Sequence, residues 1–381
     1  MKKSFLLITL FTAGTIILTD CKHDPKITAH TNNPNDPDSL YQGTQYKIPT
    51  FYIFDFPKLT NVYKDSLTNE GIQLGRRLFY EKHLSVDGQK SCASCHRASA
   101  ALSDSGNALS TNEFGPTKRN APALQNLAWA TSFFWDGRQP TAAAQAQDAA
   151  QHELGLVVNS AITYLQADSV YVKLFKKAFG RPGTITADKI YLAIQQFMFY
   201  AVSYNSRYDS VIRGQGIFTT SEYNGLNNIF LTEKGDCFHC HSDGGTNQLM
   251  TDLSFHNNGL VPALTINDFA DPGRGGITGV AADYGLFKSP TLRNIAVTGP
   301  YMHDGRFKTL RDVVNFYSDS LNLSVNPDKF ILLHMDHDSS GHVLSHGGMH
   351  LSPTEKQELL DFLNTFTDPT FLNDPNLKDP F

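Results

Sequence analysis

Apolar residues recur with helical spacing along much of the chain. In the segment that begins at Thr68, Leu74 and Leu78 are four residues apart and would share one face of a helix. Gly71 and Gly75 lie in the same segment and disfavour a helix, because glycine loses more backbone freedom on folding than other residues do. We predict a helix here in spite of the two glycines.

Three more segments carry helix signals. Residues 186–204 place a stripe of apolar side chains on one face: Ile190, Ala193, Ile194, Phe197 and Met198. Ser221 and Glu222 open a further predicted helix. The run Ser352-Pro353-Thr354-Glu355 is a capping box with proline at the first helical position, and predicts a helix through Phe366. Together these segments indicate a mainly α fold.

Two short motifs point to the chemistry. Cys92-Ala93-Ser94-Cys95-His96 and Cys237-Phe238-His239-Cys240-His241 share the spacing Cys-x-x-Cys-His, the attachment pattern of c-type haem. Two thiols one helical turn apart can both bind one porphyrin, and the next imidazole then lies under the iron. Zinc would need four ligands at each site, and a redox dithiol leaves the histidines unexplained. We therefore expect two covalent haem c groups, held by Cys92, Cys95, His96, Cys237, Cys240 and His241.

The first 20 residues have the features of a secretory signal peptide. Lys2 and Lys3 precede an apolar run from Phe5 to Leu18, which is too short to span a bilayer comfortably. Cys21 follows directly, where a lipoprotein signal places its acylated cysteine. Asp20 is unusual before such a cysteine, so ordinary cleavage nearby or an uncleaved anchor remain as alternatives. All three predict a periplasmic or cell-envelope protein, and we expect a lipid anchor to the membrane through Cys21.

The rest of the chain predicts a tether and two domains. Residues 21–45 are rich in Asn, Asp, Pro and Thr, as flexible linkers are. The formal charge of −5 becomes −6 without the signal peptide, which disfavours nucleic acid as a partner. Each haem motif lies early in its own half, so we expect two cytochrome c-like domains, 46–214 and 215–381, with one haem each.

Further runs of sequence accompany the haem motifs. They are Leu84-Ser85-Val86-Asp87-Gly88, Arg119-Asn120-Ala121-Pro122, Phe134-Trp135-Asp136-Gly137-Arg138, Leu292-Arg293-Asn294 and Gly299-Pro300-Tyr301-Met302-His303-Asp304-Gly305. In this order they resemble the bacterial dihaem cytochrome c peroxidase and MauG family, over about residues 65–367. The resemblance implies that electrons enter at the C-terminal haem and reach the N-terminal haem, where hydrogen peroxide is reduced.

The resemblance implies roles for residues near the N-terminal haem. Glu153 matches the family's distal glutamate, which would move a proton between the peroxide oxygens; a solvated carboxylate at a helix end is the alternative. Gln145 matches the distal glutamine, but its spacing from Glu153 is two residues shorter than usual, so Gln147 or His152 could take its place. Trp135 matches a residue between the haems that can relay an electron, and a packing tryptophan is the alternative.

A calcium site is also implied. Asn120, Thr298 and Pro300 match the family's inter-haem calcium ligands, and an amide oxygen with backbone carbonyls suits that ion. Without the resemblance, Asn120 would be interpreted as a turn residue.

The iron ligands depart from the simplest peroxidase pattern. No histidine occurs between His96 and His152, so we expect the N-terminal iron to be open or water-bound. Tyr317 stands seventeen residues beyond Pro300, where the peroxidases have methionine and MauG has tyrosine, and we expect it to ligate the C-terminal iron. If Tyr317 is only a core aromatic, then Met335, Met349 or no side chain takes that position.

Three functions follow from this resemblance. The first is a dihaem cytochrome c peroxidase that takes electrons from a small cytochrome c or cupredoxin and reduces hydrogen peroxide to water. The second, favoured by Tyr317, is a MauG-like oxidase that uses peroxide to modify residues of a partner protein. The third, disfavoured by Glu153, is a dihaem electron carrier without a substrate. Family peroxidases are often dimers, so a homodimer is expected.

Overall fold

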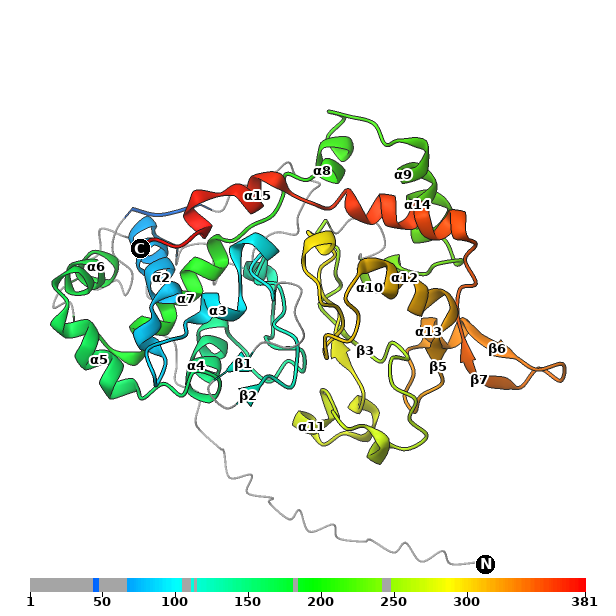
Figure 1. The fold of residues 1–381 in the computed structure, drawn as a ribbon, viewed down its shortest axis with the longest axis horizontal. Coiled ribbons are helices and arrows are strands. Elements are labelled where there is room, and N and C mark those ends of the chain that lie inside the picture. The colour runs from blue at the N-terminus through cyan, green and yellow to red at the C-terminus, as the bar shows by residue number, and fades with distance from the viewer. Residues whose placement is uncertain (1–43, 48–66, 105–110, 113–114, 181–183, 242–247) are drawn as a thin grey trace, which may run out of the picture. The chain divides into compact units, whose positions relative to one another are not determined.

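The computed structural model describes residues 44–47, 67–104, 111–112, 115–180, 184–241 and 248–381. They form a mainly helical fold, as predicted (Figure 1). The expected signal peptide, Cys21 and all but two residues of the expected tether lie outside the described residues. The helices of the first half are α2 (Asn69–Tyr80), α3 (Cys92–Cys95), α4 (Ala142–His152), α5 (Val158–Ala167), α6 (Ser169–Phe179) and α7 (Ala187–Tyr200).

The second half carries shorter helices and most of the strands. Its helices are α8 (Arg207–Ile212), α9 (Thr220–Asn224), α10 (Phe238–His241), α11 (Gly275–Thr278), α12 (Leu310–Asp319), α13 (Lys329–Leu333), α14 (Pro353–Asn364) and α15 (Pro369–Asn373). All described strand pairs are antiparallel: β1 (Thr111–Asn112) with β2 (Gly115–Pro116), β3 (Phe255–His256) with β4 (Phe287–Lys288), and β7 (Val343–Gly347) between β5 (Leu321–Asn322) and β6 (Met335–His337).

The predicted helix after Thr68 is α2, and its glycines have a packing role. The Thr68 hydroxyl caps the helix by accepting from the Gly71 amide at 3.0 Å. A Cβ atom at Gly75 would lie 1.8 Å from the carbonyl oxygen of Ala193 in α7. Glycine therefore lets α2 and α7 approach more closely than any larger residue would.

The predicted helix 186–204 is shorter than expected, because α7 ends at Tyr200. Beyond it, the Ser203 amide donates to the Asn126 side chain at 2.8 Å. The Tyr204 and Asn205 amides donate to the Asp368 carboxylate at 2.8 and 2.9 Å. Side chains from distant parts of the chain thus take the amides that another helical turn would have used.

The other two predicted helices are confirmed, with small shifts at their ends. The helix expected at Ser221 is α9, which begins one residue earlier with Thr219 as its cap. It continues as a π-helical turn over Gly225–Phe230. The Ser352 capping box opens α14 as predicted, and the helix ends at Asn364 rather than Phe366.

Two large hydrophobic cores and one smaller cluster, of Leu260, Phe316, Leu321 and Met335, are formed by the described residues. The first contains buried residues from Leu67 to Val202, and the second contains buried residues from Tyr208 to Phe366. Phe371 and Leu377 belong to the first core, so the chain returns to its first half after α14, as Figure 1 shows for α15. The predicted domain limits at 214 and 215 remain a prediction.

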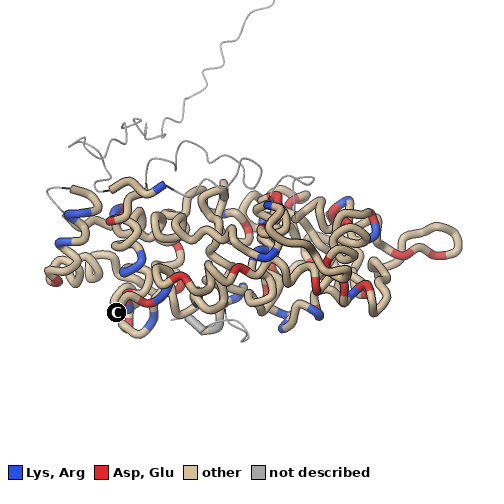
Figure 2. The backbone as a smooth tube through the Cα atoms, turned by 90° about the horizontal axis from the view of Figure 1, so that it is seen from above, with Lys and Arg blue, Asp and Glu red and all other residues tan. Residues whose placement is uncertain are grey.

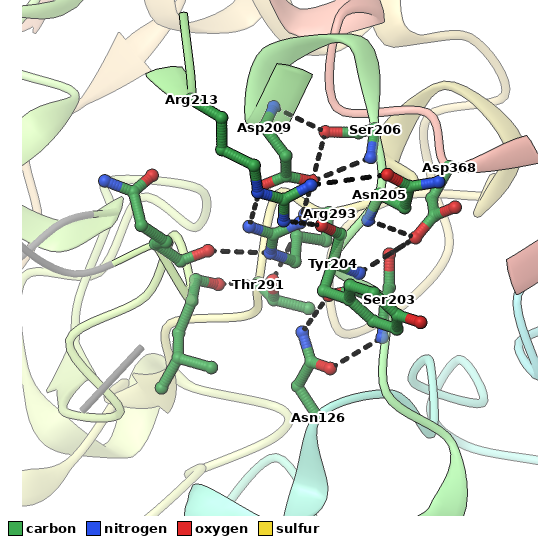
Figure 3. A network of polar contacts seen from close by, with 12 residues as sticks. Asn126, Ser203, Tyr204, Asn205, Ser206, Asp209, Arg213, Thr291, Arg293 and Asp368 are labelled. Carbon is green, nitrogen blue, oxygen red and sulfur yellow. Dashed lines mark hydrogen bonds and ion pairs between the residues drawn. The ribbon is translucent and has the colours of Figure 1, made fainter. Parts of the chain in front are cut away.

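A buried polar network joins the segments between these cores (Figure 3). The Arg293 side chain is fully buried and donates to both Asp209 oxygens at 2.7 and 2.9 Å. Its own carbonyl accepts from Gln125 at 2.5 Å, and Asn294 donates to the Gln125 amide oxygen at 2.6 Å. Asp368 closes the network through its amide, which donates to Asn294 at 2.8 Å.

Both signs of charge occur along both halves, as Figure 2 shows. Among the described residues, no helix has the length and apolar character that a membrane span requires.

Candidate active site

The first haem motif lies on a single short helix. Cys92 and Cys95 are the first and last residues of α3. Ser91 and Ser94 cap the N-terminus of this helix with reciprocal hydrogen bonds. The Nδ1 atom of His96 lies 2.9 Å from the Leu102 carbonyl oxygen and donates to it. The proton on Nδ1 leaves Nε2 as the nitrogen that can bind iron. Burial lowers the pKa of His96, which favours the neutral ligand form.

The second motif has the same arrangement. Cys240 and His241 lie on α10, which directly follows Cys237. The Nδ1 atom of His241 is 3.2 Å from the Pro290 carbonyl oxygen. Burial lowers the pKa of His241 to about 4, so the imidazole is neutral at physiological pH.

An apolar cavity opens in front of His241. We call it the His241 cavity, and it encloses about 1390 Å³ including its open mouth. Its wall combines the second haem motif with residues from α12, α13, α14 and the strands: Cys237, Cys240, His241, His256, Phe287, Lys288, Tyr301, Met302, Tyr317, Phe330, Met349 and Leu359 among others. Both thiols and the imidazole face one apolar space, so these residues fit a covalently held haem.

A second cavity is lined mainly by residues of the segments 120–135 and 288–302. We call it the Trp135 cavity, and its wall includes Asn120, Pro122, Phe133, Phe134, Trp135, Gln145, Lys288, Thr298, Pro300 and Met302. Trp135 lines both cavities. Its indole nitrogen donates to the Asn120 carbonyl at 2.8 Å, which fixes the plane of the ring. The structure therefore places the predicted relay residue between the two spaces.

Gln145 and Glu153 both belong to the α4 segment. Gln145 lines the Trp135 cavity, whereas Gln147 and His152 are exposed, so the structure favours Gln145 over the two alternatives. Glu153 caps the end of α4 and is half-buried. Among the described residues its carboxylate has no hydrogen-bond partner, and burial raises its pKa. Burial is the main cause of the raised pKa of Cys92, and the charge of Glu153 adds to it, which puts the carboxylate near the first haem motif.

Tyr317 reaches the His241 cavity from α12. Its hydroxyl accepts from the Asn258 side chain at 2.9 Å, and burial raises its pKa. Met335 packs with Leu260 and other apolar side chains and does not appear in the wall of this cavity. Met349 does line it. Of the three expected sixth-ligand candidates, Tyr317 and Met349 therefore line the His241 cavity, and Met335 does not.

The expected calcium ligands lie together. Asn120 Nδ2 is 2.5 Å from the Pro300 carbonyl oxygen, and Asn120 Oδ1 is buried without a hydrogen-bond partner. Thr298 and Pro300 line the same cavity as Asn120. Rotation of the amide by half a turn would present Oδ1 beside that carbonyl, as a hard cation requires. Among the described residues, no group of three His, Cys, Asp or Glu side chains could hold a metal, so this site would depend on neutral oxygens.

Sequence reasoning missed the ion pairs that hold the Trp135 segment. Arg119 donates to both oxygens of Asp271 at 2.7 Å and to Asp136 at 2.5 Å. Arg138 binds Asp136 and Asp148, and its guanidinium lies 3.4 Å above the Phe134 ring. Arg119, Asp136 and Arg138 stand inside the quoted runs, but nothing in the sequence indicated Asp271 or Asp148 as their partners.

His256 was also missed as a charged group of the second site. Its two ring nitrogens lie 2.7 and 2.8 Å from Asp328 and Asp252. Although burial lowers its pKa, the hydrogen bonds to these carboxylates raise it to about 12. These carboxylates therefore favour the charged form of the imidazole that lines the His241 cavity.

The fold and the two motifs define a c-type cytochrome with two haem attachment sites, and Trp135 lies in the wall of both cavities. The model of the di-haem cytochrome c peroxidase family matches residues 69–216. The methylamine utilization protein MauG of Methylorubrum extorquens is 34% identical over 66% of this chain and 69% of its own. The cytochrome c551 peroxidase of Nitrosomonas europaea is 33% identical over 68% and 75%.

A solved structure gives the same result. The crystal structure of a MauG-like protein associated with microbial copper homeostasis matches with a TM-score of 0.72 and 30% identity, over 87% of this chain and 99% of that chain. The chain belongs to the dihaem cytochrome c peroxidase and MauG family, and two haem c groups follow from that membership.

Proposed function

We propose that the protein reduces hydrogen peroxide to water at the N-terminal haem, with electrons from a small cytochrome c or cupredoxin that enter at the C-terminal haem. The observation that carries the proposal is the position of Trp135 on both cavities. A haem held by His96 would supply the iron that binds peroxide and takes up electrons. One peroxide, two electrons and two protons give two waters.

Glu153 supplies the proton chemistry in this proposal. The carboxylate takes a proton from the peroxide oxygen nearer the haem and returns it to the outer oxygen, which leaves as water. The raised pKa of Glu153 brings it nearer the working pH than an exposed glutamate would be. Gln145 lines the Trp135 cavity, and in this proposal it holds the peroxide or a water by hydrogen bonds.

Trp135 carries the electrons between the sites. The indole gives one electron toward the N-terminal site and regains one from the C-terminal site, twice for each peroxide. The hydrogen bond from its Nε1 to Asn120 keeps the ring in one orientation during the exchange. A calcium ion on Asn120, Thr298 and Pro300 would hold the loops on either side of this ring.

The test is to mix the oxidised protein with one equivalent of peroxide and follow the haem absorbance. Because no histidine stands between His96 and His152, we expect reaction without a prior reductant. Added reduced cytochrome should then be oxidised in a 2:1 ratio to peroxide. A protein that stays inert until one electron is added has a sixth ligand on the N-terminal iron, and that result would contradict the open site.

Oxidation of a partner protein is the second candidate function. Tyr317 supports it, because its side chain lines the cavity in front of His241 and its hydroxyl accepts from Asn258 at 2.9 Å. The MauG relatives support this alternative as the peroxidases support the first. Slow turnover with every small redox protein, together with peroxide-dependent oxidation of a secreted partner, would favour it.

We further propose that the mature protein is lipid-anchored at Cys21 in the cell envelope and acts as a homodimer. Replacement of Cys21 by alanine should release it from the membrane fraction. Sedimentation of the mature holoprotein with and without a calcium chelator tests both the dimer and the ion.

A further inference from the structure

One cation lies at the meeting point of the two cavities. Seven described residues line both of them: Trp135, Lys288, Ser289, Pro290, Ile295, Tyr301 and Met302. Lys288 is the only one of these with a basic side chain. The mechanism proposed above leaves it without a task.

Lys288 forms hydrogen bonds with both ends of the segment 132–135, which carries the Trp135 indole. Its amide donates to the Trp135 carbonyl at 2.8 Å. Its ammonium donates to the Ser132 carbonyl and, at 2.7 Å, to the Ser132 hydroxyl. One residue of β4 thus ties the first and last residues of the segment 132–135 to the second half of the molecule.

The ammonium is poorly hydrated where it lies. Its nitrogen is 5.5 Å from the centre of the Phe255 ring, which Arg274 also covers at 4.2 Å. Burial, together with the charge of Arg274, lowers the pKa of Lys288 to about 8, against the opposing effect of Asp136. A charge in such a place is weakly screened, so it acts strongly on charges that appear beside it.

We propose that Lys288 is a positioning residue for Trp135, which holds the indole between the two cavities and, by its positive charge, keeps the oxidised indole short-lived. An indole that loses an electron becomes a cation, and a neighbouring cation makes that state less favourable. The electron from the C-terminal site then returns quickly, and the ring leaves each cycle unchanged. This inference rests on the proposed relay role of Trp135.

The side reaction that Lys288 suppresses can be measured. If the indole stays oxidised, it loses a second electron, water adds to the ring, and two protons leave. The ring then carries one extra oxygen atom, and the peroxide that took up both electrons has left as two waters. Peptide mass spectrometry after peroxide treatment counts this product at Trp135.

The experiment compares Lys288→Gln, Lys288→Arg and Ser132→Ala holoproteins with the wild type, after equal peroxide doses without donor. At an effective dielectric constant of about 20, a unit charge within about 10 Å of the ring changes its energy by at least the equivalent of a tenfold ratio, so we expect about tenfold more oxygenated Trp135 in Lys288→Gln. Lys288→Arg restores the charge and should stay near wild type. Ser132→Ala keeps both the ammonium and its carbonyl partner, so it should do the same.

A pH series separates charge from mere packing. Wild-type oxygenation of Trp135 should rise as the pH passes about 8, where the ammonium loses its proton. Arg274 and Asp136 are the charged groups that act on it. Lys288→Gln should lack this step. Equal oxygenation in all four proteins, or a step that persists in Lys288→Gln, would overturn the inference.

A Trp135→Phe variant distinguishes a failure of the relay role of Trp135 from a failure of the positioning role of Lys288. If this variant oxidises a reduced cytochrome at the wild-type rate, the relay itself is wrong and the Lys288 role goes with it. If Trp135→Phe is slow while Lys288→Gln leaves Trp135 as intact as in the wild type, only the role of Lys288 is wrong.

Discussion

At the scale of single residues, Glu153 is the group on which peroxide turnover should depend most. Glu153→Gln keeps the shape of the side chain but removes its proton, so we expect a loss of about 10²–10⁴-fold in turnover with both haem spectra unchanged. Steady-state peroxide consumption measures it. Gln147→Glu, at an exposed position on the same helix, is a matched control that should change little.

The pH dependence of turnover has a definite sign. Burial raises the pKa of Glu153, and the reaction begins with the ionised carboxylate. Activity should therefore fall as the pH drops through this raised pKa, at a higher pH than an exposed glutamate would give. Rates recorded from pH 4 to pH 8 in wild type and Glu153→Gln test this, and a limb that survives in the variant belongs to another group.

Tyr317 carries a second prediction at this scale. Tyr317→Phe removes the hydroxyl that accepts from Asn258 and faces the His241 cavity. If that oxygen ligates the iron, the low-spin spectrum of the C-terminal haem should change while the N-terminal haem stays as before. Met349→Leu is the paired variant, and a change there alone would assign the ligand to Met349.

At the scale of helices, the contact between α2 and α7 should be sensitive to one methyl group. Gly75→Ala would bring a Cβ atom to 1.8 Å from the Ala193 carbonyl, so the helices must separate. We expect a loss of about 1–3 kcal/mol in unfolding free energy, measured by denaturant titration. Gly216→Ala is the control, since its nearest neighbour atom is 3.7 Å away.

Sequence periodicity predicted the helices better than it predicted their ends. The caps at Thr68 and Ser352 depend on residues three positions apart, so they are visible in the sequence. The end of α7 depends on Asn126 and Asp368, which are distant in sequence and take its last amides. Likewise, the motif cysteines and histidines could be identified directly. The pairing of Arg119 with Asp271 and of Lys288 with Ser132 could not, because each joins residues more than 150 positions apart.

At the scale of the whole molecule, we expect the buried ion pair Asp209–Arg293 to contribute most to the stability of the buried polar network between the two cores. Asp209→Asn removes the negative charge beside the buried Arg293 guanidinium, and we expect a loss of about 3–5 kcal/mol. Asp319→Asn breaks an exposed pair with Lys356 and should cost about 1 kcal/mol or less. Denaturant titration of both variants measures the two losses in unfolding free energy. Equal losses would contradict the role of the buried pair.

The same ion pair makes the stability of the fold depend on pH in the acid range. Burial alone would raise the pKa of Asp209, but the hydrogen bonds and charge of Arg293 hold it below its ordinary value. Its contribution is therefore fully present above about pH 4, the pKa of an unfolded aspartate, and is lost as the pH falls through the lower folded value. In Asp209→Asn that part of the acid dependence should be absent.

The return of α15 to the first half bears on how the protein is made. A ribosome delivers residues 67–202 long before Phe371 and Leu377, so the first core waits for two of its buried side chains while the second half is synthesised. Helix α15 packs against the turn Ala98–Ala100, directly after the first haem motif. The first half is thus translated first, but its hydrophobic core is completed only after the second half has been translated. A chain that stalls before α15 leaves the first half without two of its buried side chains.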